Sequence, residues 1–324
     1  MRIIFMGTPD FSVGTLKTLK SAGHDIVLAV TQPDRPKGRG RAVPFTPVKE
    51  AALELGIEVF QPRRVRESEC IEYLRGYKAD IIVVAAFGQI LPPEILDMPR
   101  YGCVNVHASL LPKYRGASPI QWAVINGEEV SGVTIMKMDE GLDTGDIIMQ
   151  RKVALDPKET AGSLFDKLSK EGAKLCAEAI TAIEDGTAVY TKQNELEATK
   201  TGQIKKELGN IDWTRPAAQI ERLIRGLTPW PGTYTALDGK VLKIWDGDIC
   251  ESALKKDSAS ADASAGAGVV PGTVLSAGKE GLMVQTGDEI LNIKELQLSG
   301  KKRMQADAFL RGYKVEAGTI LGEY

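Results

Sequence analysis

The sequence predicts an α/β fold in which a doubly wound domain with a mostly parallel sheet is followed by a smaller β-barrel domain. Strand and helix patterns alternate through the first half of the chain, which is typical of such layered sheets. Residues 81–86 form a continuous apolar run, as expected for a strand buried on both faces of a parallel sheet. The second half has short strand patterns with glycine-rich turns, which favour a barrel of the oligonucleotide/oligosaccharide-binding (OB) type.

The elements of the first domain follow from the spacing of its apolar residues. Residues 2–6 predict the first strand, and residues 10–20 predict a helix because their apolar side chains recur at helical spacing. Pro119 stands where a first helical turn accepts proline, so a helix is expected after Ser118. Further strands are expected at 26–30, 102–107, 133–138 and 147–153, and further helices at 47–55, 68–75 and 161–183.

The character of the chain changes after about residue 190. Residues 191–209 are polar and charged and are interpreted as a linker, so we expect domains at 1–190 and 210–324. Residues 213–227 predict one amphipathic helix, and 258–268 predict a flexible loop rich in Ala, Ser and Gly. Strands are expected at 233–237, 241–246, 272–276, 281–286 and 290–298. The alternative for this half is a structural barrel that binds no ligand.

Composition indicates an ordinary globular protein of the cytoplasm. The 324 residues are 43% hydrophobic and 26% charged, and no apolar run is long enough to cross a membrane. Four cysteines are scattered without a CxxC pair, which favours buried thiols in a reducing compartment over disulfides or a zinc site. With only two histidines in the chain, no metal centre is expected.

One of the two histidines lies in an unusual strand end. Asn105 and His107 are two residues apart, so on an extended strand their side chains project from the same face. An amide and an imidazole side by side can stabilise a carbonyl oxygen that becomes negative, and the imidazole can also move a proton. Asp143 follows in a glycine-flanked loop. A lone histidine is more often structural, but this combination favours a catalytic role.

The ends of two neighbouring strands are expected to form the ligand-binding edge. Ligands of open α/β sheets lie beyond the carboxyl ends of the strands, and the segments 86–91 and 105–112 both begin there. The first turn, residues 7–10, lacks the GxGxxG pattern, so a dinucleotide is disfavoured. No P-loop pattern occurs either.

A basic stretch suggests a polyanionic partner in spite of the net charge of −2. Residues 35–41 carry four positive charges and no acidic residue, and smaller basic clusters follow at 63–66, 205–206 and 301–303. One basic loop alone is often only a solvated surface. Several such patches on a nearly neutral chain favour binding to a polyanion.

Six motifs stand out along the chain: Phe5–Phe11, Thr31–Pro36, Gly38–Gly40, Asn105–Pro112, Tyr114–Ile120 and Asp139–Asp146. Together they resemble the methionyl-tRNA formyltransferase family over essentially the whole chain. The Asn-x-His…Asp set is shared with other folate-dependent formyltransferases, and the basic loop and barrel make the tRNA-specific family the better match. The resemblance implies a Rossmann-like formyltransferase domain and an OB-like tRNA-binding domain.

The resemblance also implies a reaction. The formyl donor would be 10-formyltetrahydrofolate, and the acceptor would be the α-amino group of methionine esterified to initiator tRNA. Asn105 and His107 would stabilise the oxyanion. Asp143 would orient the imidazole, favour its charged form and help to remove the proton of the attacking amine. Asp146 is the rival carboxylate, and Asp143 is preferred.

Binding residues are implied in the same way, and the protein is expected to act as a monomer without a membrane partner. The segments at the two strand ends would bind the folate, and basic residues of the loop and the linker would bind the tRNA. The folate-binding residues would be Phe87, Gly88, Gln89, Ile90, Leu91, Ser109, Leu110, Leu111 and Pro112. The tRNA-binding residues would be Arg35, Lys37, Arg39, Arg41, Lys205 and Lys206.

Two alternatives belong to other classes of protein. One is a formyltransferase that acts on a small amine, which requires neither the basic loop nor the barrel. The other is a non-catalytic RNA-binding protein with a vestigial α/β domain. The intact set of Asn105, His107 and Asp143 argues against the second alternative.

Overall fold

The computed structural model describes residues 1–36, 43–250 and 269–322. The chain forms two compact units that are not continuous in sequence. Unit 1 contains residues 1–120, 129–155 and 163–202, and unit 2 contains 121–128, 156–162 and the chain from 203 onward. The domain bounds drawn from the sequence remain a prediction.

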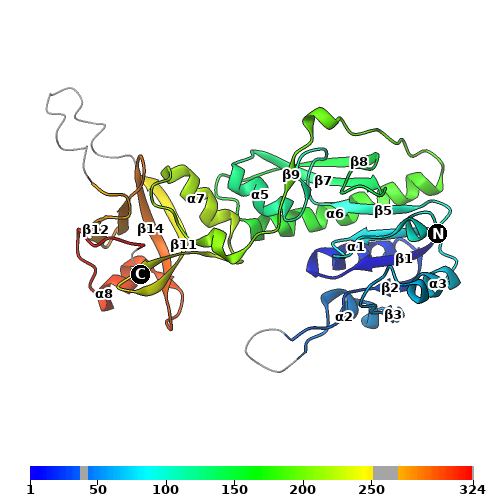
Figure 1. Cartoon of the computed structure of the whole chain (residues 1–324), viewed down its shortest axis with the longest axis horizontal. Coiled ribbons are helices and arrows are strands. Elements are labelled where there is room, and N and C mark those ends of the chain that lie inside the picture. Colours follow the sequence, from blue (N-terminus) through cyan, green and yellow to red (C-terminus); the bar gives the residue numbers. More distant parts are fainter. Residues whose placement is uncertain (37–42, 251–268, 323–324) are drawn as a thin grey trace. The chain divides into compact units, whose positions relative to one another are not determined.

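A seven-stranded sheet in the order β3-β2-β1-β4-β5-β7-β8 is the centre of unit 1 (Figure 1). The first five strands are parallel, and β7 and β8 continue the sheet in antiparallel fashion. This arrangement confirms the predicted mostly parallel sheet. The strands are β1 (Arg2–Gly7), β2 (Asp25–Val30), β3 (Val59–Phe60), β4 (Ile81–Ala85), β5 (Cys103–His107), β7 (Val130–Lys137) and β8 (Ile147–Ala154).

Helices cover both faces of this sheet, as the doubly wound pattern predicted. On one face, side chains of α3 and α4 pack with alternate residues of β1 and β4 in one apolar cluster. On the other face, Val106 of β5 and Val133 of β7 lie against α6, and Phe165 of α6 contacts Phe11 of α1. The helices of unit 1 are α1 (Asp10–Ser21), α2 (Pro47–Glu54), α3 (Ser68–Gly76), α4 (Pro93–Leu96) and α6 (Ala161–Glu184). Helix α5 (Pro119–Asn126) belongs mostly to unit 2.

Unit 2 is built on an antiparallel sheet in the order β10-β11-β14-β13-β12, with β15 paired to β14. The end of the chain bridges the two sheet edges, because Leu321 N donates to Gly272 O at 2.9 Å and Gly322 N donates to Ala236 O at 3.0 Å. The strands are β10 (Thr233–Leu237), β11 (Lys240–Cys250), β12 (Val274–Gly278), β13 (Gly281–Gln285), β14 (Ile290–Leu298) and β15 (Met304–Gln305), and the helices are α7 (Ala217–Gly226) and α8 (Ala306–Gly312).

One expectation for this part of the chain was wrong in detail. The helix expected from residue 213 begins only at Ala217, since the Asp212 carboxylate accepts hydrogen bonds from both the amide and the hydroxyl of Thr214 and holds a turn. Residues 191–209, interpreted as a linker, contain short elements of their own. They contain the 3-10 helices η1 (Glu195–Glu197) and η2 (Lys206–Gly209) and the strand β9 (Lys200–Thr201), which pairs with β6 (Arg115–Gly116).

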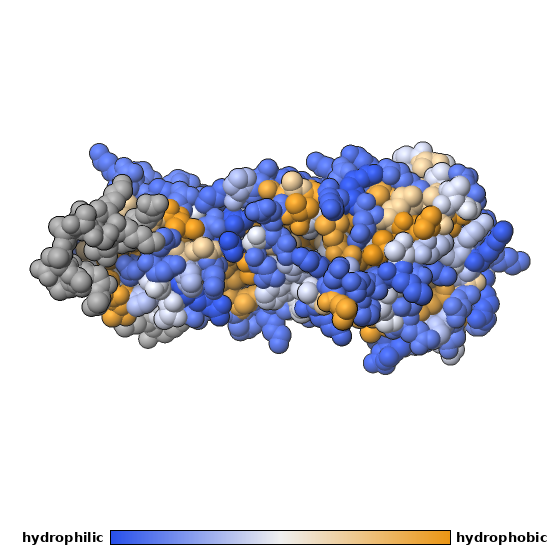
Figure 2. All heavy atoms as spheres, turned by 90° about the horizontal axis from the view of Figure 1, so that it is seen from above, coloured by the Kyte–Doolittle hydropathy of each residue, from blue (hydrophilic) through white to orange (hydrophobic). Residues whose placement is uncertain are grey.

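Hydrophilic residues cover most of the face shown in Figure 2, and apolar residues form separate patches between them. Within the described part of the chain, no helix is both long enough and apolar enough to cross a membrane.

Candidate active site

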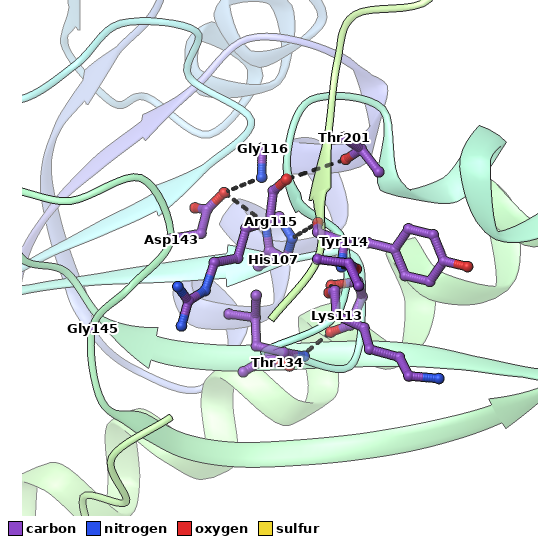
Figure 3. Close-up of polar contacts among 12 residues, drawn as sticks. His107, Lys113, Tyr114, Arg115, Gly116, Thr134, Asp143, Gly145 and Thr201 are labelled. Atoms are coloured by element: carbon purple, nitrogen blue, oxygen red, sulfur yellow. Dashed lines mark hydrogen bonds and ion pairs between the residues drawn. The ribbon is translucent and has the colours of Figure 1, made fainter. Parts of the chain in front are cut away.

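His107 is the last residue of β5, and its imidazole lies between two oxygen atoms (Figure 3). Its Nε2 is 3.0 Å from the carbonyl oxygen of Tyr114, and its Nδ1 is 3.7 Å from Oδ2 of Asp143. The second distance is too long for a hydrogen bond but close enough for strong electrostatic interaction in a buried site. Because the ring is only 6% exposed, its orientation is well defined by these neighbours. Either nitrogen therefore has an oxygen toward which a proton can point.

Asn105 lies two residues earlier on the same face of β5, as the sequence predicted. Val106 between them points to the opposite face, against α6. Asn105 is half-buried, and its side-chain amide has no hydrogen-bond partner among the described residues. A half-buried amide without a partner can donate to a ligand oxygen at little reorganisation cost.

Asp143 is held in place by its own loop. The residue adopts the left-handed backbone conformation at φ 53°, and its Oδ2 accepts a 2.8 Å hydrogen bond from the amide of Gly116. The loop is tightly packed at Gly145, where a Cβ atom would lie 1.8 Å from the carbonyl oxygen of Lys137. Glycine is therefore required at that position for the loop to fit.

Segment 191–201, which the sequence analysis assigned to the linker, lies over this loop. Nε2 of Gln193 donates to the carbonyl oxygens of both Asp143 and Gly145, each at 2.8 Å. Oε1 of Gln193 accepts from Nε of Arg115 at 3.0 Å. The Arg115 guanidinium also donates two hydrogen bonds to the Glu195 carboxylate, at 2.9 and 2.6 Å.

Sequence reasoning missed this group of three residues. Arg115 is 1% exposed, and the hydrogen bonds that it donates to Glu195 raise the pKa of its guanidinium above the ordinary value. A buried guanidinium needs a carboxylate, but the sequence around Arg115 does not show that the residue is buried. Its partner lies 80 residues away along the chain, where no local pattern marks it.

Hydrogen bonds from a side chain of β7 hold the loop that follows His107. Oγ1 of Thr134, opposite His107 in the sheet, donates to Ser109 O at 2.7 Å and accepts from Leu111 N at 3.1 Å. Oγ of Ser109 donates to the carbonyl oxygen of Lys113 at 2.7 Å. The peptide bond between Leu111 and Pro112 is cis. These contacts fix the turn that brings Tyr114 O to the imidazole.

The segments predicted to bind folate follow adjacent strands, since β4 pairs with β5 through Val84 and Asn105. Phe87 and Leu91 are buried in the apolar cluster on the α3 and α4 face, whereas Ile90 is 84% exposed. The Phe87 carbonyl oxygen already accepts from Oγ1 of Thr8. Of segment 87–91, the exposed surface is therefore mainly Gly88 and Ile90, and a folate would contact these rather than the phenyl ring.

The second predicted folate segment has the same mixture of buried and accessible residues. Ser109 and Leu111 are buried at 1% and 3% exposure, and Leu110 and Pro112 are partly exposed. Gln89, from the first segment, is also only partly exposed, and its Oε1 accepts from Val65 N at 2.7 Å. Folate binding by these residues remains a prediction.

Of the predicted tRNA-binding residues, the structure describes Arg35, Lys205 and Lys206, and all three are exposed. Lys37, Arg39 and Arg41 lie outside the described residues. Lys205 and Lys206 belong to unit 2, at the start of η2.

The rival carboxylate has different neighbours. Oδ1 of Asp146 is 3.6 Å from Nζ of Lys192, and its backbone oxygen accepts from Lys137 N at 2.9 Å. Of the two candidate carboxylates, the structure pairs Asp143 with His107.

No site for a metal ion emerges from the described residues, where no group of three or more His, Cys, Asp or Glu side chains is suitably placed. All four cysteines are free thiols. Three of them are buried, and burial raises the pKa of Cys103 and of Cys176 to about 12. The predicted buried thiols are therefore confirmed for Cys70, Cys103 and Cys176.

Comparisons with known proteins match both halves of the chain. Residues 1–180 match the family described as "Formyl transferase", and residues 203–314 match "Formyl transferase, C-terminal domain". A protein of Agathobacter rectalis named methionyl-tRNA formyltransferase is 60% identical over 320 residues, covering 99% of each chain. A protein of the same name from Lachnospira eligens is 54% identical and covers 100% of both chains.

Solved structures are similar at lower identity and support the shared fold. WlaRD, described as a sugar 3N-formyl transferase in the presence of dTDP and 5-N-formyl-THF, is 19% identical with a TM-score of 0.63. The match covers 93% of this chain and 99% of that one. HypX from Aquifex aeolicus, in complex with tetrahydrofolic acid, is 19% identical with a TM-score of 0.60, covering 98% of this chain and 50% of that one.

Proposed function

The chain belongs to the methionyl-tRNA formyltransferase family, and from this premise we propose that it transfers a formyl group to the methionine of initiator methionyl-tRNA, for the initiation of translation. The donor is 10-formyltetrahydrofolate, and the acceptor is the α-amino group of the esterified methionine. The observation that carries this proposal is the full-length similarity to relatives of that name, together with the buried pair of His107 and Asp143 beside the unpartnered amide of Asn105.

The donor supplies an activated formyl carbon, which the amine of methionine attacks while the nitrogen that carried the formyl group departs. The surface at the strand ends fits such a group, since Ile90 offers an exposed apolar side chain and Asn105 an unused amide at the edge of the same sheet. Exposed backbone at Gly88 adds hydrogen-bonding groups to that apolar surface.

Asn105 and His107 stabilise the negative charge that develops on the formyl oxygen. Both side chains lie on one face of β5, and an N–H of the His107 ring reaches the same oxygen as the Asn105 amide when the ring turns away from the carbonyl oxygen of Tyr114. Neither group must move far, because β5 is paired on both sides and the His107 ring is buried. Preorganised donors of this kind typically contribute about 10²–10³ in rate each.

Asp143 keeps the imidazole of His107 in its working orientation. Its carboxylate stabilises the positive charge that the imidazole gains when it takes a proton from the attacking amine. Its carboxylate is fixed from the other side by the amide of Gly116 at 2.8 Å. The 3.7 Å gap to Nδ1 can close by a small rotation of either side chain. Formation of a charge-assisted hydrogen bond in the reacting complex is therefore accessible without movement of the backbone.

The tRNA is held by positive charge on both units. Arg35, Lys37, Arg39 and Arg41 contact the acceptor end, and Lys205 and Lys206 contact phosphates of the acceptor stem. We assign residues 1–190 to formyl transfer, 210–324 to tRNA binding and 191–209 to the connection between them. The protein acts as a monomer in the cytoplasm.

The test is transfer of labelled formyl from 10-formyltetrahydrofolate to charged initiator tRNA by the purified protein. Product that co-migrates with formyl-methionyl-tRNA is the expected result. The same donor is offered with a sugar-nucleotide amine and with an uncharged tRNA as controls. Turnover of the sugar-nucleotide amine in preference to the charged tRNA would identify a formyltransferase that acts on a small amine. No turnover of any acceptor would support the alternative of a non-catalytic RNA-binding protein.

A further inference from the structure

Unit 2 contains a cavity of 720 Å³ that has no role in the site described above. The last turns of α5, the chain around η2 and the first two turns of α7 form its wall. Its volume is within the range of small-ligand sites, about 300–1,000 Å³. The lining residues are Trp122, Ile125, Asn126, Glu207, Leu208, Asn210, Asp212, Arg215, Gln219, Ile220, Arg222 and Leu223. Because Asn126, Asn210 and Gln219 are exposed, the cavity opens to the solvent.

Two arginines one helical turn apart on α7 differ sharply in their partners. Arg225 has partners for its charge, since its guanidinium donates twice to Glu221, at 2.8 and 2.9 Å, and once to the carbonyl oxygen of Glu159 at 2.8 Å. Arg222 lines the cavity and is half-buried, yet no hydrogen bond or ion pair reaches its guanidinium from the described residues. A half-buried cation without a partner is costly unless a ligand supplies the counter-charge.

The position of the Arg222 guanidinium depends on a glycine. A Cβ atom at Gly127 would lie 2.5 Å from Cζ of Arg222, so the planar group rests directly against the Gly127 backbone. This packing holds the guanidinium at the cavity wall. A fixed guanidinium offers paired N–H donors in the geometry that a phosphate group accepts.

The other cavity walls suit a planar, partly polar group. The cavity is lined by Trp122 and by the apolar side chains of Ile125, Leu208 and Leu223. An indole is a surface on which a nucleobase can stack. Gln219 adds an amide group that can pair with the edge of a base. A group that binds phosphate and an apolar wall on which a base can stack lie in one cavity. This combination indicates a nucleotide.

Neighbouring charge favours a nucleotide within a polynucleotide. Lys205 and Lys206 are exposed and directly precede Glu207 and Leu208 in the cavity wall, and no ion pair reaches either lysine from the described residues. A free nucleotide carries only its own phosphates, whereas an RNA strand places one phosphate on each successive nucleotide. The strand can therefore contact Arg222 and the two lysines together.

We propose that this cavity binds one nucleotide of the tRNA substrate, with its phosphate on Arg222 and its base against the Trp122 wall. The proposal rests on the proposed function, because tRNA is the RNA that function supplies. The site lies wholly in unit 2 and includes none of Asn105, His107 and Asp143, which carry the chemical step. Its loss should therefore weaken tRNA binding without changing the chemical step.

The first experiment compares Arg222→Met with Arg311→Met, which removes the same charge from an exposed ion pair on α8. Arg222→Met should raise the Kd for initiator tRNA about tenfold or more. It should also reduce the slope of log affinity against log salt by about 0.7–0.9, whereas Arg311→Met changes neither quantity. Arg222→Lys should restore the slope, because the charge is kept, but only part of the affinity, because paired donation is lost. Equal tRNA affinity and slope in Arg222→Met and the wild type would overturn the proposal.

A second experiment does not depend on the folding of the Arg222 variants. A photo-crosslinking amino acid replaces Gln219, an exposed residue of the cavity rim, in the full-length protein. Irradiation with labelled initiator tRNA should give a protein–RNA crosslink. Excess unlabelled tRNA, added before irradiation, should prevent its formation, and AMP at equal phosphate concentration should not. Absence of the crosslink under conditions where tRNA binds, or its prevention by AMP, would reject an RNA-binding cavity. Because both readouts measure binding, they are independent of formyl transfer, which is assayed separately.

Discussion

Gln193 bridges the loop that presents Asp143, since a single side-chain amide donates to the carbonyl oxygens of Asp143 and Gly145, both at 2.8 Å. The same side chain accepts from the buried guanidinium of Arg115, whose neighbour Gly116 donates to the Asp143 carboxylate. The carboxylate and its backbone are thus held by one connected network. Gln193 acts on catalysis only through Asp143 and is a positioning residue.

Replacing Gln193 by Ala should lower kcat about 10–100-fold, because a shift of about 1 Å at the reacting groups can cost that much. The KM for charged tRNA should change little. Gln193→Glu should be at least as harmful, since a carboxylate would face two carbonyl oxygens. Steady-state kinetics with both substrates provides the measurement.

The matched control for Gln193 is Gln203→Ala, at an exposed residue ten positions later in the chain. It should leave kcat unchanged. A purely structural role for Gln193 would lower the melting temperature and the amount of folded enzyme but leave kcat per folded molecule intact, which would contradict the positioning role.

Replacing His107 by Asn should reduce turnover by about 10²–10⁴, because charge stabilisation and proton transfer are lost together. Binding of tRNA should hardly change, as the imidazole is buried at the end of β5. Single-turnover formyl transfer at saturating tRNA measures the chemical step, and filter binding measures tRNA affinity. A variant with near-normal turnover would remove His107 from the mechanism.

Asp143→Asn should remove most of the activity while the fold is kept. Asparagine tolerates the left-handed conformation at this position, and its side-chain oxygen can still accept from Gly116 N, but it carries no charge to stabilise an imidazolium. Asp146→Asn is the control and should be milder, because that carboxylate lies beside Lys192. If Asp146→Asn proves the more damaging of the two in turnover assays, the carboxylate has been assigned wrongly.

The parallel core and the catalytic strand could be predicted because their signals are local. All five residues of β4 are apolar and buried, and the two-residue spacing of Asn105 and His107 fixes their shared face. The strand–helix alternation likewise required no long-range information. In each case one stretch of chain carries the whole pattern.

Elements that depend on distant partners could not be predicted in this way. β6 and β9 contain two residues each, and they pair across 85 positions of the chain. The polarity of segment 191–201 indicated solvent exposure, yet Gln193 and Glu195 are polar because they complete the buried Arg115. Polarity alone does not distinguish a side chain that faces water from one that satisfies a buried charge.

Asp34 joins the two ends of the basic loop. Its carboxylate accepts from Nζ of Lys49, from Nε2 of Gln61 at 3.0 Å and from the amide of Thr46 at 3.2 Å. Burial alone would raise the pKa of Asp34, but the hydrogen bonds outweigh it and hold the pKa below the ordinary value. Since the folded-state pKa is the lower one, the stabilisation is present above the unfolded-state pKa and is lost as the pH falls through the folded-state pKa.

Asp34→Asn should therefore destabilise the protein at neutral pH by about 1–3 kcal/mol, the usual cost of breaking hydrogen bonds to a charged, partly buried group. The difference in the free energy of unfolding between the variant and the wild type should be constant from about pH 6 to 8. It should shrink below about pH 4, where the wild-type carboxylate becomes protonated and loses its charge. Urea unfolding across this range measures it. The control is Glu54→Gln on α2, where an exposed ion pair with Lys17 at 3.4 Å should contribute less than about 1 kcal/mol. A difference for Asp34→Asn that does not depend on pH would show that the carboxylate acts by shape and hydrogen bonding rather than by charge.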